Sequence, residues 1–518
     1  MKTKNIKYLI LLIALGAVSC AKLNEDPRSF IPASQFYKTQ ADAVASVTAT
    51  YSLLNAGANS VQSPYNTLFN TGMDFMGDDE GPGPGATNAD VRSQAVLGHS
   101  ASGLRILQIW QQHYAAIKKA NIAIDTIPDI KFDATLNKRL VAEAKFLRAL
   151  YYFNLVRLYG DVPLVLHDQT SINLSDLQVP RTAAATVYTQ IETDLTAAAT
   201  DLPNSYTGAD VGRATAGAAY SLLAKVYLTE RKWDKAVTQA EAVISGPYGY
   251  DLFTNYADVF LPATENGKEH IFSAQFKSNS QGQGNNQAPR SVLNGIPGMV
   301  GSYADQVVFY SVPDATKPNG VDKFFSIYKL YPANDKRKRV SFVTRFQSPT
   351  TNLYYGKLND ATIANDSIPF FNKYFDPSVA ANEAESGANV PIIRFSDVLL
   401  IHAEAENELN GPTTKAYASI NRVRKRAGLD DLSGLDQASF RNAVYLERRL
   451  EFVFEYQRWF DLIRERDASG KGILEASLLK VGKTNVSKGA AGKFYLFPIP
   501  QQEIDNSNGK LTQNPGWQ

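Results

Sequence analysis

Two glutamates one helical turn apart, Glu447 and Glu451, are the residues whose types and spacing come nearest to a catalytic pair. Carboxylates at this spacing on a helix lie roughly 6 Å apart, close to the ~5–5.5 Å that retaining glycosidases use. A general acid needs a raised pKa, whereas the neighbouring Arg448 and Arg449 favour the ionised carboxylate. Catalytic carboxylates also usually face a cleft from different elements. We therefore predict that the pair is structural and that the protein is not an enzyme.

The other residues able to do chemistry form no known catalytic or metal-binding pattern. The five histidines are scattered along the chain: His99, His113, His167, His270 and His402. They form no H-E-x-x-H sequence, and no G-x-S-x-G or Walker sequence occurs. The segment "HAEAE" from His402 is predicted to be a helix surface. The acidic run "GDDEGPG" (residues 77–83) offers carboxylates to calcium but lacks the spacing of a calcium loop, so we predict a solvated acidic loop, no metal and no cofactor.

The first 20 residues, "MKTKNIKYLILLIALGAVSC", have the layout of a secretory signal. Lysines precede an apolar run, and small residues then lead to Cys20, the single cysteine of the chain. The ending "AVSC" resembles a lipobox, in which Cys20 carries diacylglycerol and becomes the mature N-terminus; the alternative is that Cys20 only ends the apolar run. Residues 1–19 are predicted to be a lipoprotein signal peptide and residues 20–38 an anchor and linker to a membrane.

Apolar residues at helical spacing recur along the chain, so the fold class is predicted to be mainly α. The helices expected on this ground cover residues 39–55, 107–127, 136–160, 186–202, 396–409, 413–427 and about 437–466. Residues 214–245 read as two antiparallel helices joined at "TERKW", in the manner of a tetratricopeptide hairpin. A net charge of +2 gives no reason to expect nucleic acid as a partner.

The segment "LERRLEFVFEYQRWFDLIRERD" (residues 446–467) is predicted to lie within the last of these helices. Its apolar residues fall into two stripes, one through Phe454 and one through Tyr456, so the helix must be largely enclosed. Its charges then need partners, because unpaired buried charge costs several kcal/mol. Helical spacing predicts many of these partners one turn away, as for Asp461 and Arg464.

Two segments differ from the helical pattern. Residues 246–390 are rich in Asn, Gly, Pro, Ser and aromatic residues, with short β-like runs such as "HIFSAQF" and "VSFVTRF". A second irregular segment covers residues 71–88. Loops of this length inside a compact domain are usually functional.

Nine motifs in a fixed order resemble the SusD/RagB family of outer-membrane nutrient-binding lipoproteins. They are "CAKLNEDP", "IWQQHYAAIKKANIAID", "AEAKFLRALYYFNLVRLYGDVPLV", "VPRTAAATVYTQIETDL", the hairpin at residues 214–245, "IIRFSDVLLIHAEAENEL", "INRVRKRAGL", "ERRLEFVFEYQRWFDLIR", and "YLFPIPQQEID" with "LTQNPGW". The resemblance runs nearly from end to end. It implies a SusD-like scaffold of four tetratricopeptide-like helix pairs with an irregular, aromatic-rich middle region containing short β-strands. On this reading, residues 39–245 and 391–518 are the helical parts and residues 246–390 the irregular region.

The resemblance also implies a function. Family members lie on the extracellular face of the outer membrane, lid-like over a SusC-like TonB-dependent transporter, and capture oligosaccharides, or in some branches peptides, for import. They are not enzymes. Acidic residues after Cys20, in "KLNED", are loosely similar to the export signal of such surface lipoproteins. A peptide-binding RagB-like protein and a tetratricopeptide scaffold of the envelope are the alternatives.

A sugar-binding site needs aromatic faces bordered by polar side chains. Two segments have this mixture. The candidate residues are Tyr65, Phe69, Asp74, Phe75, Asn88 and Arg92 in the first segment, and Tyr303, Phe309, Tyr310, Tyr328 and Tyr331 in the second. All four tryptophans fall in framework motifs, so the site is predicted to rely on Tyr and Phe. Core packing is an equal alternative for each aromatic residue.

Overall fold

The computed structural model describes residues 37–56, 63–83, 85–171, 173–278, 284–285, 307–309, 326–344, 346–347, 354–355, 369–376 and 386–517. The predicted signal peptide and lipid site, including Cys20, lie outside these residues, as do Tyr303 and Tyr310. Within the part of the chain that is described, no helix is both long and apolar enough to cross a membrane.

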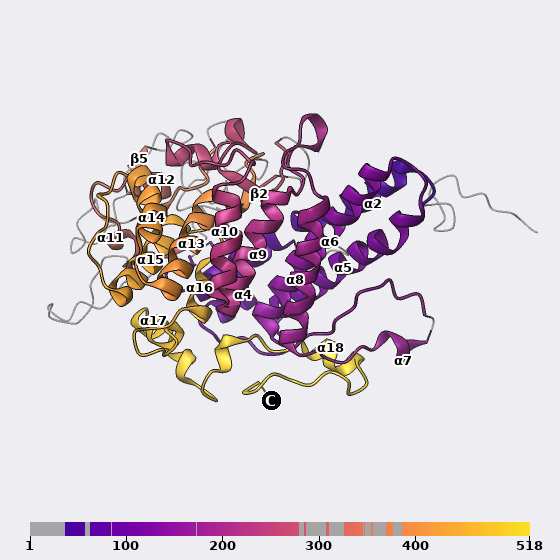
Figure 1. Cartoon of the computed structure of the whole chain (residues 1–518). Coiled ribbons are helices and arrows are strands. Elements are labelled where there is room, and N and C mark those ends of the chain that lie inside the picture. Colours follow the sequence, from indigo (N-terminus) through magenta and orange to yellow (C-terminus); the bar gives the residue numbers. More distant parts are fainter. Residues whose placement is uncertain are drawn as a thin grey trace, which may run out of the picture.

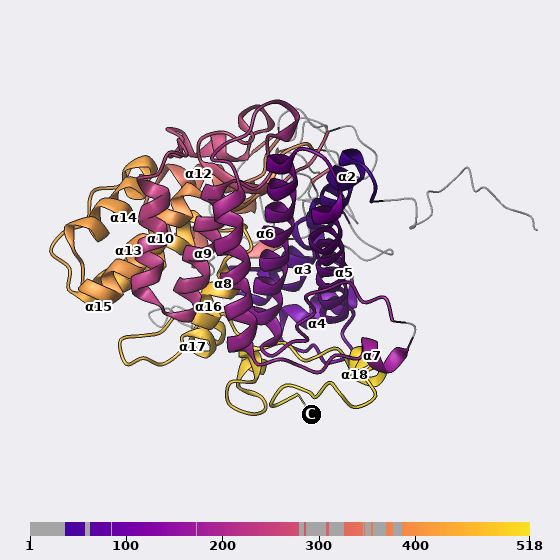
Figure 2. The ribbon, with the colours of Figure 1, turned by 45° about the vertical axis from the view of Figure 1, so that its right-hand side comes forward.

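Long helices packed side by side in chain order form the scaffold (Figure 1). They are α2 (Gln40–Tyr51), α5 (Leu104–Thr126), α6 (Ala134–Tyr159), α8 (Ala184–Asp201), α9 (Ala216–Glu230), α10 (Trp233–Ile244), α13 (Phe395–Asn410) and α14 (Thr414–Ala427). Figure 2 shows this order across the molecule, from α2 at the right to α14 at the left. The eight helices make four consecutive pairs, which confirms the predicted mainly α, tetratricopeptide-like scaffold.

Local sequence signals place several helix ends close to where the spacing predicts them. Asp133 caps α6, its carboxylate accepting from the Leu136 N–H at 2.7 Å, and Gly160 ends this helix with φ at 70°. Thr215 caps α9 through the Ala218 N–H at 3.1 Å. The hairpin then turns at Arg231, in the left-handed region with φ at 60°, so the joint predicted within "TERKW" is confirmed.

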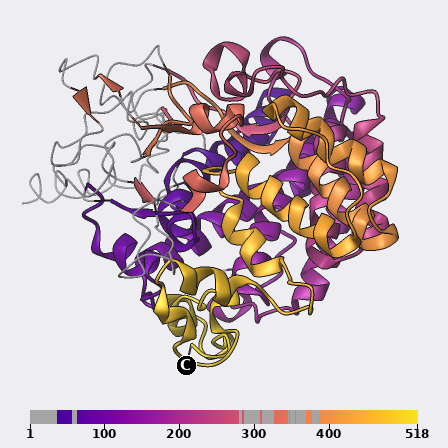
Figure 3. The ribbon, with the colours of Figure 1, turned by 90° about the vertical axis from the view of Figure 1, so that its left-hand side faces the viewer.

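The other helices and the strands lie outside the four pairs, and the last helices of the chain surround its C-terminus (Figure 3). These helices are α3 (Phe69–Gly72), α4 (Ala89–Ala95), α7 (Leu174–Leu177), α11 (Ser326–Leu330), α12 (Lys336–Ser341), α15 (Gln437–Glu451), α16 (Arg458–Arg464), α17 (Leu474–Lys480) and α18 (Gln501–Asn506), of which only α15 is as long as the helices of the pairs. The strands are β1 (Glu80–Pro82), β2 (His270–Ala274), β3 (Val307–Phe309), β4 (Phe342–Val343), β5 (Phe346–Gln347), β6 (Tyr354–Tyr355), β7 (Phe370–Phe371) and β8 (Val390–Arg394). They form antiparallel pairs: β1 with β3, β2 with β8, β4 with β7 and β5 with β6.

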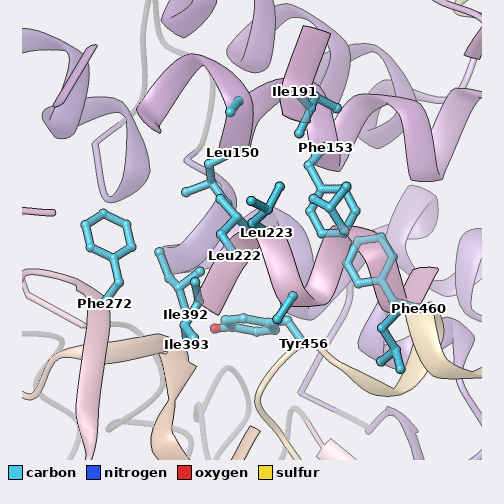
Figure 4. Packing of buried hydrophobic residues seen from close by; sticks show 14 of the residues in the cluster. Leu150, Phe153, Ile191, Leu222, Leu223, Phe272, Ile392, Ile393, Tyr456 and Phe460 are labelled. Carbon is cyan, nitrogen blue, oxygen red and sulfur yellow. The ribbon is translucent and has the colours of Figure 1, made fainter. Parts of the chain in front are cut away.

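The main core joins the scaffold to the segment that contains α15 and α16 (Figure 4). Side chains from α6, α8 and α9 meet the strands β2 and β8 there, represented by Leu150, Phe153, Ile191, Leu222, Leu223, Phe272, Ile392 and Ile393. Tyr456 and Phe460 enter the same cluster from the C-terminal side. A second cluster lies under the middle region and contains Phe342, Phe371 and Phe454. Burial of this much apolar surface is the main favourable term in folding.

The single helix predicted over about 437–466 is wrong, because the chain leaves the helix between Glu451 and Arg458. Phe454 and Tyr456 both take positive φ, at 64° and 59°. Two rings of this segment pack in different cores: the Phe454 ring lies 4.4 Å from that of Phe371 in the second cluster, whereas the Tyr456 ring lies 6.2 Å from that of Phe69 in the first. A straight helix cannot reach both, and the break costs about 1–2 kcal/mol per left-handed residue.

Candidate functional site

The two segments predicted to carry ligand-binding residues meet in the structure. Strand β1, from the first segment, pairs antiparallel with β3 of the middle region, with Glu80 opposite Phe309 and Pro82 opposite Val307. Backbone hydrogen bonding thus joins parts of the chain more than two hundred residues apart. We give the name candidate ligand surface to the elements that carry the predicted residues: residues 80–83 and 85–92, β3, and α11, which follows β3 in the chain.

Two arginines from the α15–α16 segment hold the acidic run that leads into β1. Arg458 binds the Asp78 carboxylate through Nε and Nη2, at 2.7 and 2.9 Å, and Arg449 Nε lies 2.7 Å from Asp79 Oδ1. Burial by itself raises the pKa of Asp78, but Arg449 and Arg458 outweigh it and hold that pKa below its usual range. Asp78, Asp79 and Glu80 are all buried, so the prediction of a solvated acidic loop is wrong.

A lysine supports the same run from the C-terminal side. Lys483 is buried, and its Nζ donates to the Phe75 carbonyl oxygen at 2.6 Å. Burial lowers the pKa of Lys483 to about 7. Gln94 on α4, which follows β1, donates through Nε2 to the Gly72 carbonyl oxygen at 2.6 Å. The segment before β1 is therefore held by side chains from three other parts of the chain, a degree of support that precise binding surfaces need.

A buried ion cluster lies where α15 ends. Its five cations are Arg337, Lys373, Arg394, Arg424 and Arg426, and its five carboxylates are Asp335, Glu269, Glu447, Glu451 and Glu455. The cluster thus holds equal numbers of opposite charges, so that no charge is left uncompensated. Most partners come from the middle region and from α14, although the predicted one-turn pair of Arg464 and Asp461 is present at 2.8 Å.

This cluster explains the two glutamates that resemble a catalytic pair. Glu451 is fully buried and lies within 3.0 Å of Arg394 and Arg337. Burial alone would raise the pKa of Glu451, but Arg426, Arg394 and Arg337 together hold it well below its usual range. Glu447 lies 2.6 Å from Arg337 Nη1. Glu451, held ionised in this way, has no proton to donate, so this carboxyl does not suit the role of a general acid.

"HAEAE" does not form the helix surface that the sequence predicts. His402, Glu404 and Glu406 are all buried within α13. His402 Nδ1 lies 2.8 Å from Ser419 Oγ, and Glu404 binds Arg464 through both oxygens. Among the residues that the structure describes, no group of three or more His, Cys, Asp or Glu side chains is arranged to hold a metal ion.

Five of the predicted ligand-binding residues lie in the interior. Tyr65 and Phe69 belong to the main core, Phe75 packs with α4, and Tyr331 belongs to the second cluster. Asp74 is 5% exposed, and burial raises its pKa. These side chains support the candidate ligand surface from below and present no face to solvent in this structure.

Three other predicted residues lie at the candidate ligand surface. Asn88 is exposed and caps α4 through the Asp90 and Val91 N–H groups. Arg92 is exposed, and its Nη2 donates to the Gly83 carbonyl oxygen at 2.7 Å. Tyr328 on α11 is half-buried, with Lys338 Nζ 4.1 Å from its ring centroid. Phe309 lies on β3, where the structure describes only its backbone.

A separate cavity of about 630 Å³ also combines aromatic and amide side chains. Its lining includes Trp110, Tyr114, Gln111, Gln178 and Glu503. The amides are largely engaged within the protein, because Gln111 donates to Glu503 at 3.1 Å and Gln178 to the Asn506 carbonyl oxygen at 2.7 Å. Trp110 is 4% exposed, so this cavity offers little free indole surface.

The residues that sequence reasoning missed are the positioning residues Arg449, Arg458 and Lys483. The signal for them is the acidic run itself, since three consecutive acids in an apolar setting need cations. Nothing in the sequence indicates that these cations lie about 370–400 residues further along the chain.

Comparison with known proteins agrees with the fold. A family model described as the SusD family matches residues 268–517, and a second, described as starch-binding and associating with the outer membrane, matches residues 40–228. The SusD-like protein P2 of Formosa agariphila is 29% identical over 538 residues, covering 100% of both chains. A crystal structure of a SusD superfamily protein from Parabacteroides distasonis has a TM-score of 0.73 at 26% identity, covering 92% of this chain and 99% of its own.

A solved laminarin-binding SusD-like protein is 25% identical, with a TM-score of 0.69, covering 93% of this chain and 100% of its own. The two family models together leave out little beyond the N-terminal segment and residues 229–267. With the likenesses above, they define the class of protein to which this chain belongs. The chain belongs to the SusD family, as its ordered motifs predict.

Proposed function

We propose that this protein is a cell-surface lipoprotein that captures oligosaccharides and delivers them to a SusC-like TonB-dependent outer-membrane transporter. One observation carries the proposal: the β1–β3 pair unites the Asn- and Arg-bearing segment with the aromatic middle region on a firmly held frame. Support comes from the likeness to a laminarin-binding protein over 93% of the chain.

The chemistry of the candidate ligand surface suits a neutral sugar. The Tyr328 ring offers a flat face for C–H groups, and Arg92 and Asn88 offer N–H donors for hydroxyl oxygens. The ion pairs and buried rings beneath hold this surface in place, so little ordering entropy is lost on binding. We propose binding without turnover, and the ties of Asp78 and Asp79 to arginines support this.

Attachment through Cys20 would keep the protein beside its transporter. Residues 20–38 span at most about 65 Å when fully extended. The helical body begins with α2 at Gln40, so the tether allows the body to move only within tens of ångströms of the membrane. A Cys20→Ser variant is expected to lose lipid labelling and to leave the membrane fraction.

Calorimetric titration of the protein without its first 20 residues tests ligand capture. Starch and laminarin oligosaccharides are the first ligands, and saturable binding of one class without product release is the expected result. Arg92→Ala and Tyr328→Ala are each expected to weaken binding about tenfold, the equivalent of one lost hydrogen bond or stacking contact. Lys480→Ala, an exposed change on α17, is the matched control. Product release, or equal affinity in all variants, would contradict the proposal.

Affinity purification of a C-terminally tagged copy from gently solubilised outer membranes tests delivery. A TonB-dependent barrel in equal amount is the expected companion. A lipidated protein recovered alone would rule out a stable lid. Recovery with other envelope proteins but no barrel would instead favour a scaffold.

A further inference from the structure

Five arginines line a cavity of about 500 Å³. Its lining includes residues of α6, α8, α9 and α16, which Figure 1 labels, and of the C-terminal segment. The five arginines are Arg157, Arg181, Arg231, Arg464 and Arg466. Asp161 is the one carboxylate among the lining residues, and its Oδ1 accepts from the Ala184 N–H at 2.8 Å. The cavity shares no lining residue with the candidate ligand surface.

Two of the five arginines are fully engaged by the protein. Arg464 binds the carboxylates of Glu404 and Asp461. Arg181 donates to the carbonyl oxygens of Asp161 and Thr512, at 2.8 and 2.9 Å, and ties the C-terminal segment to the scaffold. These two therefore have structural roles.

The other three arginines, Arg157, Arg231 and Arg466, also donate to neutral acceptors, as Arg181 does, but each makes fewer hydrogen bonds than Arg181. Arg157 Nη2 lies 2.6 Å from Asn154 Oδ1, and Arg231 Nη2 lies 3.0 Å from the Arg464 carbonyl oxygen. Arg466 Nη1 donates to the Ile463 and Glu465 carbonyl oxygens, at 3.1 and 2.9 Å. None of the three forms a short salt bridge of the Arg464 kind with any described residue. Arg231 and Arg466 do border Glu404, Glu408 and Asp467 in a neighbouring hollow, where Glu404 is bound by Arg464 and Glu408 by Arg441.

The Arg157 guanidinium is held firmly in the wall. Its central carbon lies 3.8 Å from the ring centroid of Phe153 and 3.5 Å from that of Phe460, so two aromatic faces enclose it. Burial lowers the pKa of Arg157 to about 10. The pKa of Arg231 is lowered by burial and then by the charges of Arg466 and Arg464. Crowded cations of this kind are stabilised by an anion.

Aromatic residues complete the cavity, with Tyr188, Phe460 and Tyr495 in its lining. A volume of about 500 Å³ lies in the range of small-molecule sites, and planar guanidinium groups match the oxygens of sulfate, phosphate and carboxylate groups. We propose that this cavity binds a sugar-sized acidic ligand through a sulfate, phosphate or carboxylate group held by Arg157, Arg231 and Arg466. The proposal does not depend on oligosaccharide capture at the candidate ligand surface.

Calorimetric titration with galactose 6-sulfate, glucose 6-phosphate and glucuronate tests the proposal. Galactose and glucose are the neutral references, and sodium chloride keeps the ionic strength constant, since chloride screens exposed charges equally in all cases. At least one acidic sugar is expected to bind about tenfold or more tightly than its neutral reference, as one charge-assisted contact provides. The probe that binds best identifies the acidic group.

The double variant Arg231→Asn/Arg466→Ala is expected to weaken acidic-sugar binding about tenfold or more. Asn is chosen because it tolerates the positive φ of Arg231, which is 60°. Arg422→Ala/Lys480→Ala, which removes two exposed charges elsewhere, is the matched control and is expected to bind as the unchanged protein does.

Equal binding of acidic and neutral sugars, or equal affinity in the double variant and the unchanged protein, would overturn the proposal. If the double variant loses its native circular dichroism, Arg466→Ala alone carries the same comparison. Starch and laminarin oligosaccharides titrated against the same proteins keep the two proposals apart, because their binding is expected to be unaffected by the double change.

Discussion

Replacing Glu451 by Gln tests whether the buried ion cluster stabilises the break between α15 and α16. The Glu451 side chain is fully buried, with Oε1 2.9 Å from Arg394 Nη1 and Oε2 3.0 Å from Arg337 Nη1. Arg426 contacts the same Oε1. Gln keeps the size and one acceptor but removes the charge and places an amide donor among guanidinium groups.

The expected loss is about 3–5 kcal/mol of the free energy of unfolding, the usual cost of leaving buried charge uncompensated. In the variant, five cations of the cluster face four carboxylates. Glu241→Gln is the matched control, because Glu241 pairs with Lys415 at 2.8 Å while their side chains are 39% and 68% exposed. An exposed ion pair contributes about 0–1 kcal/mol to the free energy of unfolding, so the control is expected to lose no more than this.

The contribution of Glu451 to the free energy of unfolding changes with pH in a definite direction. Since the pKa of Glu451 lies below its unfolded value of about 4.3, this residue contributes its full stability above that pH and loses it as the pH falls further. The difference between unchanged and variant protein is therefore expected to be full at pH 7 and to shrink below about pH 4.

Urea unfolding followed by circular dichroism and tryptophan fluorescence measures these free energies. The reasoning is refuted if Glu451→Gln loses no more than Glu241→Gln at pH 7 with an unchanged dependence on urea. A loss that stays constant as the pH falls below 4 would also contradict it, since the effect would then come from packing and not from charge.

Three further predictions concern other contacts. Asp78→Asn weakens the two hydrogen bonds from Arg458, of 2.7 and 2.9 Å. Limited proteolysis near β1 is therefore expected to become faster and the affinity for oligosaccharides to fall. An unchanged cleavage rate would contradict the role of Asp78 in holding this segment. Lys483 has a pKa of about 7 when folded, so the free energy of unfolding is expected to rise with pH between about 7 and 10, and this rise should vanish in Lys483→Met. Gly217→Ala is expected to destabilise the protein by about 1–3 kcal/mol despite the higher helix propensity of Ala, because the added Cβ would lie 2.6 Å from the Tyr250 ring; a more stable variant would show that the ring moves aside.

The helical scaffold could be predicted because its signals are local. Apolar spacing, the Gly160 end and the turn at Arg231 each depend on neighbours within a few residues, and the structure places helices there. Family membership also came from the sequence, since short motifs keep their order without reference to the fold. The two irregular segments were predicted from composition alone.

The candidate ligand surface could be predicted only in part. Composition identified both segments that β1 and β3 unite, but it could not separate Tyr65, which is 5% exposed, from the half-buried Tyr328. An aromatic ring has the same sequence signature whether it packs in a core or faces a ligand. The outcome depends on which other segments cover it.

The break after Glu451 was decided entirely by tertiary structure. Helical spacing continues through residues 452–457, and local preference alone would extend α15. Arg394 and Arg337 instead bind Glu451 from other parts of the chain, and Phe454 and Tyr456 pack into two different cores. Long-range ion pairs and buried rings together outweigh a helix propensity of less than about 1 kcal/mol per residue. The sequence by itself therefore determined the helices and the family, and the folded chain decided which charges and rings meet.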